Sequence, residues 1–411
     1  MSADGRGKVA VLCHGYIPHF RLRLYALLAE RRDVEYVFFH GEPPSWIGVP
    51  ELPGPFAFTE RRINNHEFRF GPYSLVYQPV LWEILTGGYD AVVVTTEAKF
   101  ISNLLLAFLG RLRGMKVMLW GFGFHPVRGF RDSDQPHPAT RFANFVKDSV
   151  VKYLANGYLA YTRMGRDKLV ANGYPSERVF VLQNTIDMTE QIRLYENIAD
   201  EDEQEIRRRL GLRPDSIVFL HIGRLVQIKR VDLMIEAVRR INDEHLASRP
   251  VEALIIGSGT AEEELKAGAA GIAGIHFLGA LPPNEEVARC LKVSAAVVIG
   301  GMVGLVANHA LAHGRPVIAR DTDVHSPEVE YIEDDINGLM VPGSMDDFVA
   351  ALARFVDSPE MQARLAAGAL RSRETLRIEF MAENFDNAVR TTIGRRPVAS
   401  EGRAPAPLHG E

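Results

Sequence analysis

The chain has 411 residues, more than a single hydrophobic core usually supports, and 46% of them are apolar and 24% charged. These proportions are ordinary for globular proteins and exclude a fibre or a disordered chain. The net charge is −5, both signs are spread along the sequence, and no basic stripe alternates with aromatic residues, so we expect no nucleic-acid partner.

The first half of the chain alternates apolar runs with helical stretches, which is typical of a parallel sheet covered on both faces. We expect strands at residues 9–12, 35–39, 91–95, 116–120, 159–161 and 179–181. The short polar start is followed directly by the first strand, so no secretory signal is expected. A helix over 139–155 is amphipathic, and two interpretations stay open: it packs on its own domain, or it docks on a membrane surface.

The strand pattern breaks at Asn184 and resumes after a charge-rich helical connection over 187–214. The second set of strands is expected at 217–221, 253–256, 275–277, 296–299 and 316–319. Helices from Ser344 onward end near Gly394, and the Pro-, Ala- and Gly-rich remainder predicts a disordered tail. The two halves therefore predict two α/β domains.

The stretch 221–237, HIGRLVQIKRVDLMIEA, places two cations, Arg224 and Lys229, between an apolar strand and an amphipathic helix. The apolar positions 231, 234, 235 and 238 recur at helical spacing, so this helix is expected to pack one face inward. Because ligands of parallel sheets bind at the carboxyl ends of the strands, the two cations favour an anionic ligand there.

Further features bear on ligands. The glycine-rich loop 300–304 follows a strand and precedes a helix, an arrangement that lets backbone N–H groups approach a phosphate. Gly257 and Gly259 lack the spacing of a dinucleotide site. Cys13 and Cys290 stand far apart without His partners, so we expect both to be buried and inert in a reducing cytoplasm. The Asp-x-Asp pairs 132/134 and 321/323 are not expected to hold a metal, because two cations already supply positive charge.

Several segments together resemble one family. The motif at 221–237 is similar to the pattern GRLxxxKGxDxLIxA of the retaining glycosyltransferases of family 4, which have the GT-B fold of two facing Rossmann-like domains. Five further segments resemble the same family in the same order, at 9–39, 173–187, 253–265, 275–287 and 304–343. The chain departs from the family at Arg230, where Gly is usual, and at Gly301 and His309, where the family has the two glutamates of its Glu-x7-Glu motif. A branch with VGL followed by NHA resembles this variant.

The resemblance implies roles for particular residues. Arg224 and Lys229 would stabilise the leaving diphosphate, and His125 is the candidate catalytic group of the first domain, with a structural role as the alternative. His309 would hydrogen-bond the donor ribose, again with a structural role open. The other donor-side residues are Gly15, Gly223, Gly257, Phe277, Leu278, Gly301, Met302, Val303, Gly304, Leu305 and Glu328, and those on the acceptor side are His14, His19 and Arg21.

The resemblance also implies a domain plan and a function. The plan is an acceptor-side domain over 1–186, a nucleotide-sugar domain over 187–375, a helix over 376–393 that crosses back to the first domain, and a tail over 394–411. The expected activity is transfer of a sugar from a nucleoside-diphosphate donor, with UDP favoured, to a glycan, lipid-linked or small-molecule hydroxyl acceptor, with retention and without cofactor or metal. Polysaccharide or glycoconjugate assembly is the expected setting, in the cytoplasm, with peripheral contact to the inner face of the membrane left open. A non-catalytic binding subunit and a nucleotide-sugar epimerase are the alternatives.

Overall fold

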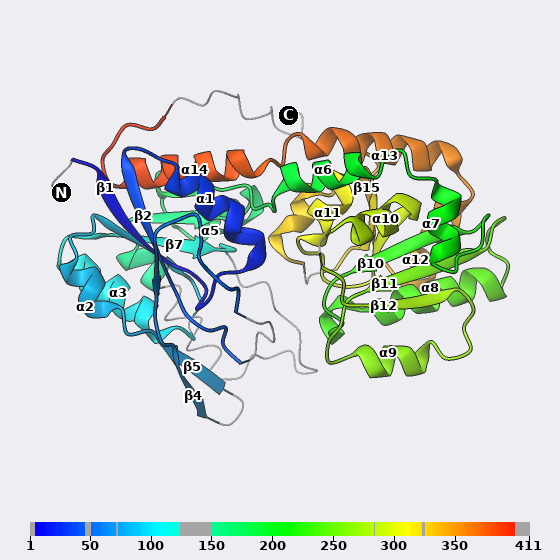
Figure 1. The fold of residues 1–411 in the computed structure, drawn as a ribbon, viewed down its shortest axis with the longest axis horizontal. Coiled ribbons are helices and arrows are strands. Elements are labelled where there is room, and N and C mark those ends of the chain that lie inside the picture. The colour runs from blue at the N-terminus through cyan, green and yellow to red at the C-terminus, as the bar shows by residue number, and fades with distance from the viewer. Residues whose placement is uncertain are drawn as a thin grey trace. The chain divides into compact units, whose positions relative to one another are not determined.

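The computed structural model describes residues 5–45, 51–70, 73–97, 99–123, 149–282, 284–322 and 325–398. The chain divides into two compact units. Among the described residues, unit 1 holds the chain up to Asp187 together with the segment from Ile378 onward, and unit 2 is Met188–Arg377. Each unit contains a parallel sheet with helices on both sides (Figure 1), which confirms the predicted fold class.

Unit 1 is built on a seven-stranded sheet in the order β3-β2-β1-β6-β7-β8-β9, in which every pairing is parallel. Its strands are β1 (Gly7–Leu12), β2 (Val34–His40), β3 (Glu60–Arg62), β6 (Ala91–Thr95), β7 (Lys116–Gly121), β8 (Gly157–Ala160) and β9 (Val179–Val181). An antiparallel hairpin of β4 (His66–Phe70) and β5 (Tyr73–Tyr77) stands apart from this sheet. The helices are α1 (Leu22–Ala29), α2 (Leu81–Thr86), α3 (Ile101–Leu112), α5 (Arg163–Ala171) and α14 (Ile378–Thr392), with a π-helix at Val150–Leu154 and 3-10 turns at His19–Arg21 and Ser176–Arg178.

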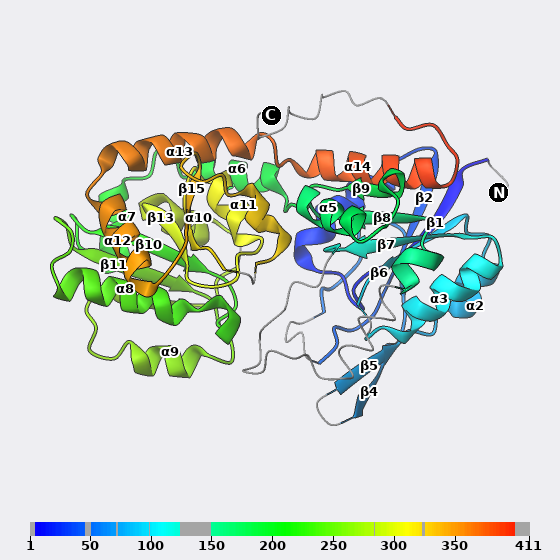
Figure 2. The ribbon, with the colours of Figure 1, turned by 180° about the vertical axis from the view of Figure 1, so that it is seen from behind.

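The strands of unit 1 bury alternate side chains on opposite faces, as the period of two requires. One face packs against α1 and α14 with Val9, Val11, Tyr36, Phe38, Val93 and Trp120, and the other packs against α2, α3 and α5 with Ala10, Leu12, Phe39, Val92, Val94 and Leu119. Thus the last helix of the chain, α14, shares its face with α1, and the two helices lie side by side in Figure 1. Seen from behind, α14 lies next to β8 and β9, which it also contacts (Figure 2).

Unit 2 contains a six-stranded parallel sheet in the order β12-β11-β10-β13-β14-β15. Its strands are β10 (Ile217–Ile222), β11 (Val251–Ile256), β12 (Ile275–Gly279), β13 (Ala296–Ile299), β14 (Val317–Arg320) and β15 (Gly338–Val341). Its helices are α6 (Met188–Asn197), α7 (Glu203–Arg209), α8 (Val231–Asp243), α9 (Glu262–Gly268), α10 (Glu285–Val293), α11 (Val306–Ala312), α12 (Met345–Val356) and α13 (Pro359–Arg373), with 3-10 turns at Gln227–Lys229 and Pro327–Tyr331. One core joins the sheet to α8, α9 and α12, and the other joins it to α7, α10 and α11.

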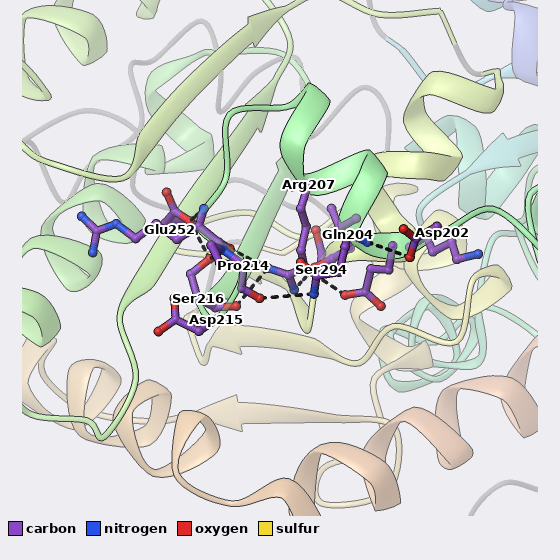
Figure 3. A network of polar contacts seen from close by, with 12 residues as sticks. Asp202, Gln204, Arg207, Pro214, Asp215, Ser216, Glu252 and Ser294 are labelled. Carbon is purple, nitrogen blue, oxygen red and sulfur yellow. Dashed lines mark hydrogen bonds and ion pairs between the residues drawn. The ribbon is translucent and has the colours of Figure 1, made fainter.

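A buried polar network fastens α7 to the amino-terminal edge of this sheet (Figure 3). The guanidinium of Arg207 donates to the carbonyl oxygens of Ser216 at 3.1 Å and Val293 at 3.2 Å, and the Ser216 hydroxyl donates to the carboxylate of Glu252. The carboxylate also accepts from the Arg213 backbone N–H at 2.8 Å. Because these buried charged groups are hydrogen-bonded, their burial is tolerated. The polar groups at the amino-terminal edge therefore have a structural role.

The structure refines several sequence-based expectations. Strand β8 ends at Ala160, before Tyr161, and β14 starts one residue after Pro316. Strands β3, β4, β5 and β15 were not predicted, and residues 395–398, assigned to a tail, are hydrogen-bonded to unit 1 through Arg395 and Val398. Cys13 and Cys290 are buried, and burial raises the pKa of both thiols to about 12, as expected of inert cysteines. Most of the predicted helix over 139–155 lies outside the described residues. No helix among the described residues is long and apolar enough to cross a membrane.

Candidate functional site

The strand order of unit 2 places its candidate site at the reversal of the winding. β10 lies between β11 and β13, so the connections after β10 and β13 leave the sheet in opposite directions. In open α/β sheets the crevice outside the carboxyl ends of such a pair is where ligands bind. The segments that follow these two strands are the predicted cation motif and the predicted glycine-rich loop.

Glycines allow the turns at this edge to approach one another. Gly257 has φ of 144°, and a Cβ there would lie 1.8 Å from the carbonyl oxygen of Gly223. Gly223 in turn receives support through its N–H, which donates to the Ile256 carbonyl at 3.0 Å. Any side chain at Gly257 would therefore push the β10 turn away from β11.

Two hydrogen bonds join the cation motif to the glycine-rich loop. The Met302 N–H donates to the Ile228 carbonyl at 2.9 Å, and the Lys229 ammonium donates to the Met302 carbonyl at 2.8 Å. A Cβ at Gly304 would lie 3.3 Å from the Lys229 Nζ, so the absence of a side chain there leaves room for the ammonium. Lys229 is thus held against the loop that the sequence predicts to cradle a phosphate.

The surroundings of Lys229 are polar but partly closed to water. Burial lowers its pKa to about 8, with the buried carboxylate of Glu328 acting in the opposite direction and Arg224 adding to the decrease. Arg224 itself is exposed at the same turn. His221, buried at the end of β10, has a pKa lowered to about 4, first by burial and then by the charge of Lys229. Of the charged groups here, Lys229 and Arg224 are therefore the ones suited to attract an anion.

The departure at Arg230 and Gly301 has a packing counterpart. Arg230 adopts the left-handed conformation, φ 47° and ψ 47°, just before α8, which a glycine adopts at lower cost. A Cβ at Gly301 would lie 2.3 Å from the Ile228 carbonyl oxygen and 3.0 Å from the Arg230 Cβ. The backbone of this loop therefore leaves no space for the family's Glu at position 301.

His309 lies on α11 and is hydrogen-bonded to the preceding connection. Its Nδ1 is 3.0 Å from the Oε1 of Gln191, a buried residue of α6. One turn further on, His313 packs edge-on against Tyr195 of α6, with ring centroids 5.8 Å apart. The position of the second family Glu is thus occupied by an imidazole whose orientation is fixed by α6.

The remaining donor-side candidates are distributed over the same edge. Phe277 and Leu278 belong to β12 and are half-buried. Val303 is fully buried, its N–H donating to the Nδ1 of His325 at 3.2 Å, and Leu305 directly precedes α11. The structure therefore places every donor-side candidate of unit 2 at or near the carboxyl edge of one sheet.

A cavity of about 1000 Å³ borders the same turn, between α8, α9 and the glycine-rich loop. It is lined in part by Ile228, Arg230, Gly301 and Met302. Neither Lys229 nor Arg224 is among its lining residues, so the cavity and the two cations are separate features of the same turn.

In unit 1 the loop after β1 also stands at a reversal of winding, between β1 and β6. Gly15 has φ of 81°, and its carbonyl accepts from the N–H of Gly41 at 2.8 Å and from the Asn65 side chain at 2.7 Å. A Cβ at Gly15 would lie 3.0 Å from the Phe100 ring. Two hydrogen bonds and the Phe100 ring therefore hold this loop in place, and its contact with the donor stays a prediction.

The acceptor-side candidates share this loop but differ in environment. His14 stands 5.6 Å from the Trp120 ring, and its pKa is lowered to about 3 by burial and by Arg21, so it is neutral near pH 7. Arg21 is buried between aromatic rings and donates to the Asn184 side chain and, at 3.3 Å, to the Thr185 carbonyl. These contacts give Arg21 a structural task in holding the end of unit 1, and its acceptor role stays a prediction. His19 is exposed at the start of a 3-10 turn.

Some candidates cannot be placed. His125, both residues of the pair Asp132 and Asp134, and Asp323 lie outside the described residues. Within the described part of the chain, no cluster of three or more His, Cys, Asp or Glu side chains could hold a metal ion. The expectation that the protein works without a metal stays a prediction.

Sequence reasoning missed two participants: Gln191, which contacts His309, and His325, which accepts from the Val303 N–H in the glycine-rich loop. Gln191 is 118 residues from His309, so local spacing carried no signal for that pair. His325 is the first residue of the segment HSPEVEYI, in which the sequence analysis selected only Glu328.

Comparisons with known proteins point to one family. Residues 216–358 match the family model described as glycosyl transferases group 1. The chain is 29% identical over 273 residues to a D-inositol 3-phosphate glycosyltransferase of Kribbella flavida, a match that covers 63% of this chain and 61% of that protein. With the corresponding enzyme of Nocardioides it is 29% identical over 373 residues, covering 84% and 73%. The chain spans less than two thirds of the length of the first of these relatives.

Solved structures share the fold at low sequence identity. Anabaena HepE in complex with UDP and glucose superposes with a TM-score of 0.67 at 15% identity, covering 94% of this chain and all of that one. Sucrose-phosphate synthase from Thermosynechococcus elongatus gives a TM-score of 0.71 at 14% identity, covering 95% and 100%. Together with the family match in unit 2, these similarities confirm the predicted resemblance to GT-B glycosyltransferases of the family 4 type, with two Rossmann-like domains.

Proposed function

We propose that this GT-B protein of the family 4 type transfers a sugar from a nucleoside-diphosphate donor to a hydroxyl acceptor, with retention at the sugar carbon. The observation that carries the proposal is the hydrogen bond of Lys229 to Met302 in the glycine-rich loop, with the exposed Arg224 at the same turn, in the unit that matches the family. UDP is the favoured nucleoside diphosphate, because the HepE structures contain UDP or UDP-glucose.

In the proposed reaction the bond between the sugar carbon and the diphosphate breaks and the acceptor oxygen bonds to that carbon on the same face. The acceptor proton passes to an oxygen of the leaving phosphate, so no protein nucleophile is needed. Charge grows on the diphosphate as it departs, and preorganised cations stabilise such charge more in the transition state than in the ground state. This is the role we assign to Arg224 and Lys229.

The experiment that tests this function is a panel of UDP-, GDP- and dTDP-sugars, read out as thermal stabilisation and as release of nucleoside diphosphate. A ligand that binds only the folded state raises the melting temperature, and slow hydrolysis of the donor shows that the bond is activated. Stabilisation by a nucleotide-sugar with release of its diphosphate supports the proposal. Activity is expected to persist in excess chelator. An acceptor panel would include inositol phosphates, because the relatives are named for D-inositol 3-phosphate.

Two alternatives predict different outcomes. Binding of a nucleotide-sugar without any turnover would indicate a non-catalytic binding subunit, which the replacement of both family glutamates by Gly301 and His309 favours. Conversion of the sugar in the absence of an acceptor would indicate an epimerase.

We also propose that unit 1 contacts an anionic membrane surface. Leu105, Phe108 and Leu112 form an exposed apolar stripe on α3, and the exposed Trp82 lies on the neighbouring helix α2. The stripe ends beside Arg111, and α3 contains no acidic residue. Large apolar side chains flanked by cations are typical of surfaces that lie in the lipid interface.

Co-sedimentation with vesicles tests this contact. Binding to vesicles that contain anionic lipid is expected to fall in the Phe108→Ser, Leu112→Ser double variant and to persist in Leu246→Ser, which removes an exposed apolar side chain of unit 2. Equal sedimentation of all three proteins, or self-association that disappears in the double variant without any vesicle binding, would count against a membrane contact.

A further inference from the structure

We infer that Gln191 is a positioning residue, which fixes the imidazole of His309 in the form that accepts a hydrogen bond from the donor ribose. The inference rests on the proposed function for the identity of the ligand. The state of the imidazole itself can be measured without any ligand, so the two can fail separately.

The contact defines which ring nitrogen carries the proton. The partner atom on Gln191 is the amide oxygen, 3.0 Å from the Nδ1 of His309. An amide oxygen only accepts, so Nδ1 must donate, and a neutral imidazole then has an acceptor lone pair on Nε2. Because Gln191 is buried, with 6% of its surface exposed, water competes poorly for this bond.

A second contact holds the two helices in the same register. Tyr195 and His313 each lie one helical turn beyond Gln191 and His309, and their rings meet edge-on. Burial lowers the pKa of His313 to about 3, with His309 contributing to the decrease, so His313 is uncharged at ordinary pH. The contacts between the two helices thus include one polar and one aromatic pair, and neither pair adds a charge beside His309.

Other titratable groups on the elements packed against α11 must be counted in any pH experiment. They are Glu190, Arg193, Tyr195 and Glu196 on α6, Glu328, Glu330 and Tyr331 on the 3-10 turn Pro327–Tyr331, Arg320 on β14, Glu360, Arg364, Arg371 and Arg373 on α13, and His313 and Arg315 just after α11. Gln191 contacts the imidazole directly and is neutral at every pH.

The arrangement explains how a histidine can stand where the family has a Glu. A Glu carboxylate accepts from ribose hydroxyls in any orientation, whereas an imidazole accepts only through the nitrogen that lacks a proton. The hydrogen bond to Gln191 determines that this nitrogen is Nε2. Protonation of the ring at low pH converts the acceptor into a donor, so affinity for the ribose is expected to fall in acid.

The first test uses the intact protein without ligand. Long-range ¹H–¹⁵N spectra of the histidine side chains, assigned with the His309→Ala variant, should show the Nδ1–H form for His309. In Gln191→Leu the Nε2–H form should appear. An Nε2–H form in the unmodified protein would overturn the inference.

The second test measures the affinity for UDP against pH. His309→Ala should weaken binding by about tenfold, and Gln191→Leu by about three- to tenfold, as expected for loss or misdirection of one hydrogen bond in a partly closed site. In Gln191→Glu the new carboxylate favours the protonated ring, so the fall in affinity should move to higher pH. Gln204→Leu, on the exposed face of α7, serves as the matched control and should match the unmodified protein.

A double variant separates positioning from a structural role. If Gln191 acts through His309, then Gln191→Leu should have no further effect on UDP affinity once His309 is Ala. Additive losses in the double variant, or an unshifted pH profile in Gln191→Glu, would overturn the inference. If the unmodified protein does not bind UDP, the nucleoside diphosphate that stabilises it in the donor panel takes the place of UDP in this test. If none of them binds, the proposed function fails, and the spectra alone decide the role of Gln191.

Discussion

Two residues in the turn after β10 are in conformations or environments that lower the stability of the fold. Lys229 keeps an ammonium in surroundings that lower its pKa, and Arg230 holds a left-handed backbone without being glycine. Strain and perturbed pKa values concentrate at functional sites, where function and not stability selects the residue. Both residues belong to the one turn that carries the candidate diphosphate site.

The pKa of Lys229, lowered to about 8, predicts opposite pH dependences for binding and for stability. Affinity for UDP should fall as the pH rises through about 8, because the ammonium loses its charge. Between about 8 and the ordinary lysine value near 10.5 the unfolded chain binds more protons than the folded one, so this residue's contribution to the unfolding free energy should become less unfavourable as the pH rises.

Calorimetric titration with UDP measures the first trend, and urea unfolding measures the second. Both are carried out from about pH 7 to about pH 10, the range that contains the two pKa values of the lysine. The Lys229→Met protein, which cannot titrate at this position, provides the baseline for both. Identical pH dependences in the two proteins would show that Lys229 does not carry the effect.

Arg230 predicts a ranking of stabilities. Arg230→Gly and Arg230→Ala both lose the ion pair with Asp232, which is 2.8 Å long and exposed, but only Gly relaxes the left-handed backbone. The Gly variant should therefore be more stable than the Ala variant by about 1 kcal/mol. Urea unfolding of both proteins gives the difference, and an Ala variant as stable as the Gly variant would contradict the assigned strain.

At the scale of elements, the strands with continuous apolar runs could be predicted from the sequence, and β6, β9 and β13 have the predicted bounds. Such runs mark strands buried on both faces. β3, with the sequence ERR, is a half-exposed edge strand without that signal, and β15 is short and begins with Gly338, whose approach to the Val317 carbonyl leaves no room for a Cβ. Short edge strands are fixed by their neighbours in space, which sequence periodicity does not report.

The same division holds for the candidate site. Arg224, Lys229 and the loop 300–304 could be found because each lies in the segment that follows an apolar strand, where parallel sheets present ligand groups. The lacing of Lys229 to Met302 and of Gln191 to His309 joins residues 73 and 118 positions apart. Contacts at such separations follow from sheet order and helix packing, so a single sequence does not contain them.

Helix α14 predicts a strong effect of a single buried carboxylate. Asp386 accepts from the Tyr36 hydroxyl and from the Arg390 guanidinium, both at 2.7 Å, and all three groups are buried against unit 1. Asp386→Ala leaves the Tyr36 hydroxyl without its acceptor and leaves the buried Arg390 guanidinium only its ion pair with the exposed Asp33, 3.1 Å away. The change should cost about 3 kcal/mol of unfolding free energy.

The control for this variant is Asp346→Ala, which removes an exposed carboxylate paired with Arg240 and should cost less than about 1 kcal/mol. Urea unfolding at neutral pH compares the two. A loss at Asp386 no larger than that at Asp346 would mean that the network does not fasten α14 to unit 1.

Helix α14 belongs to unit 1, although it follows unit 2 in the sequence. Ending the chain after Arg377 removes Met381 and Phe385 from the core that also contains β1 and α1, so it should unfold unit 1 or make it aggregate. Ending it after Val398 keeps every described contact of the tail and should leave the thermal midpoint unchanged. Equal midpoints for the two shortened proteins would contradict this plan of the fold.

We propose that the carboxyl edge of the unit 2 sheet binds a nucleoside diphosphate through Arg224 and Lys229. The most direct measurement is the affinity for UDP, by calorimetry, of the unmodified protein, Arg224→Met, Lys229→Met and the distant exposed control Arg364→Met, with donor turnover measured in parallel. The account predicts that the control binds like the unmodified protein, whereas each of the other variants folds normally, binds UDP more weakly and turns over its donor about two orders of magnitude more slowly. Unchanged UDP affinity and turnover in both folded site variants would contradict it.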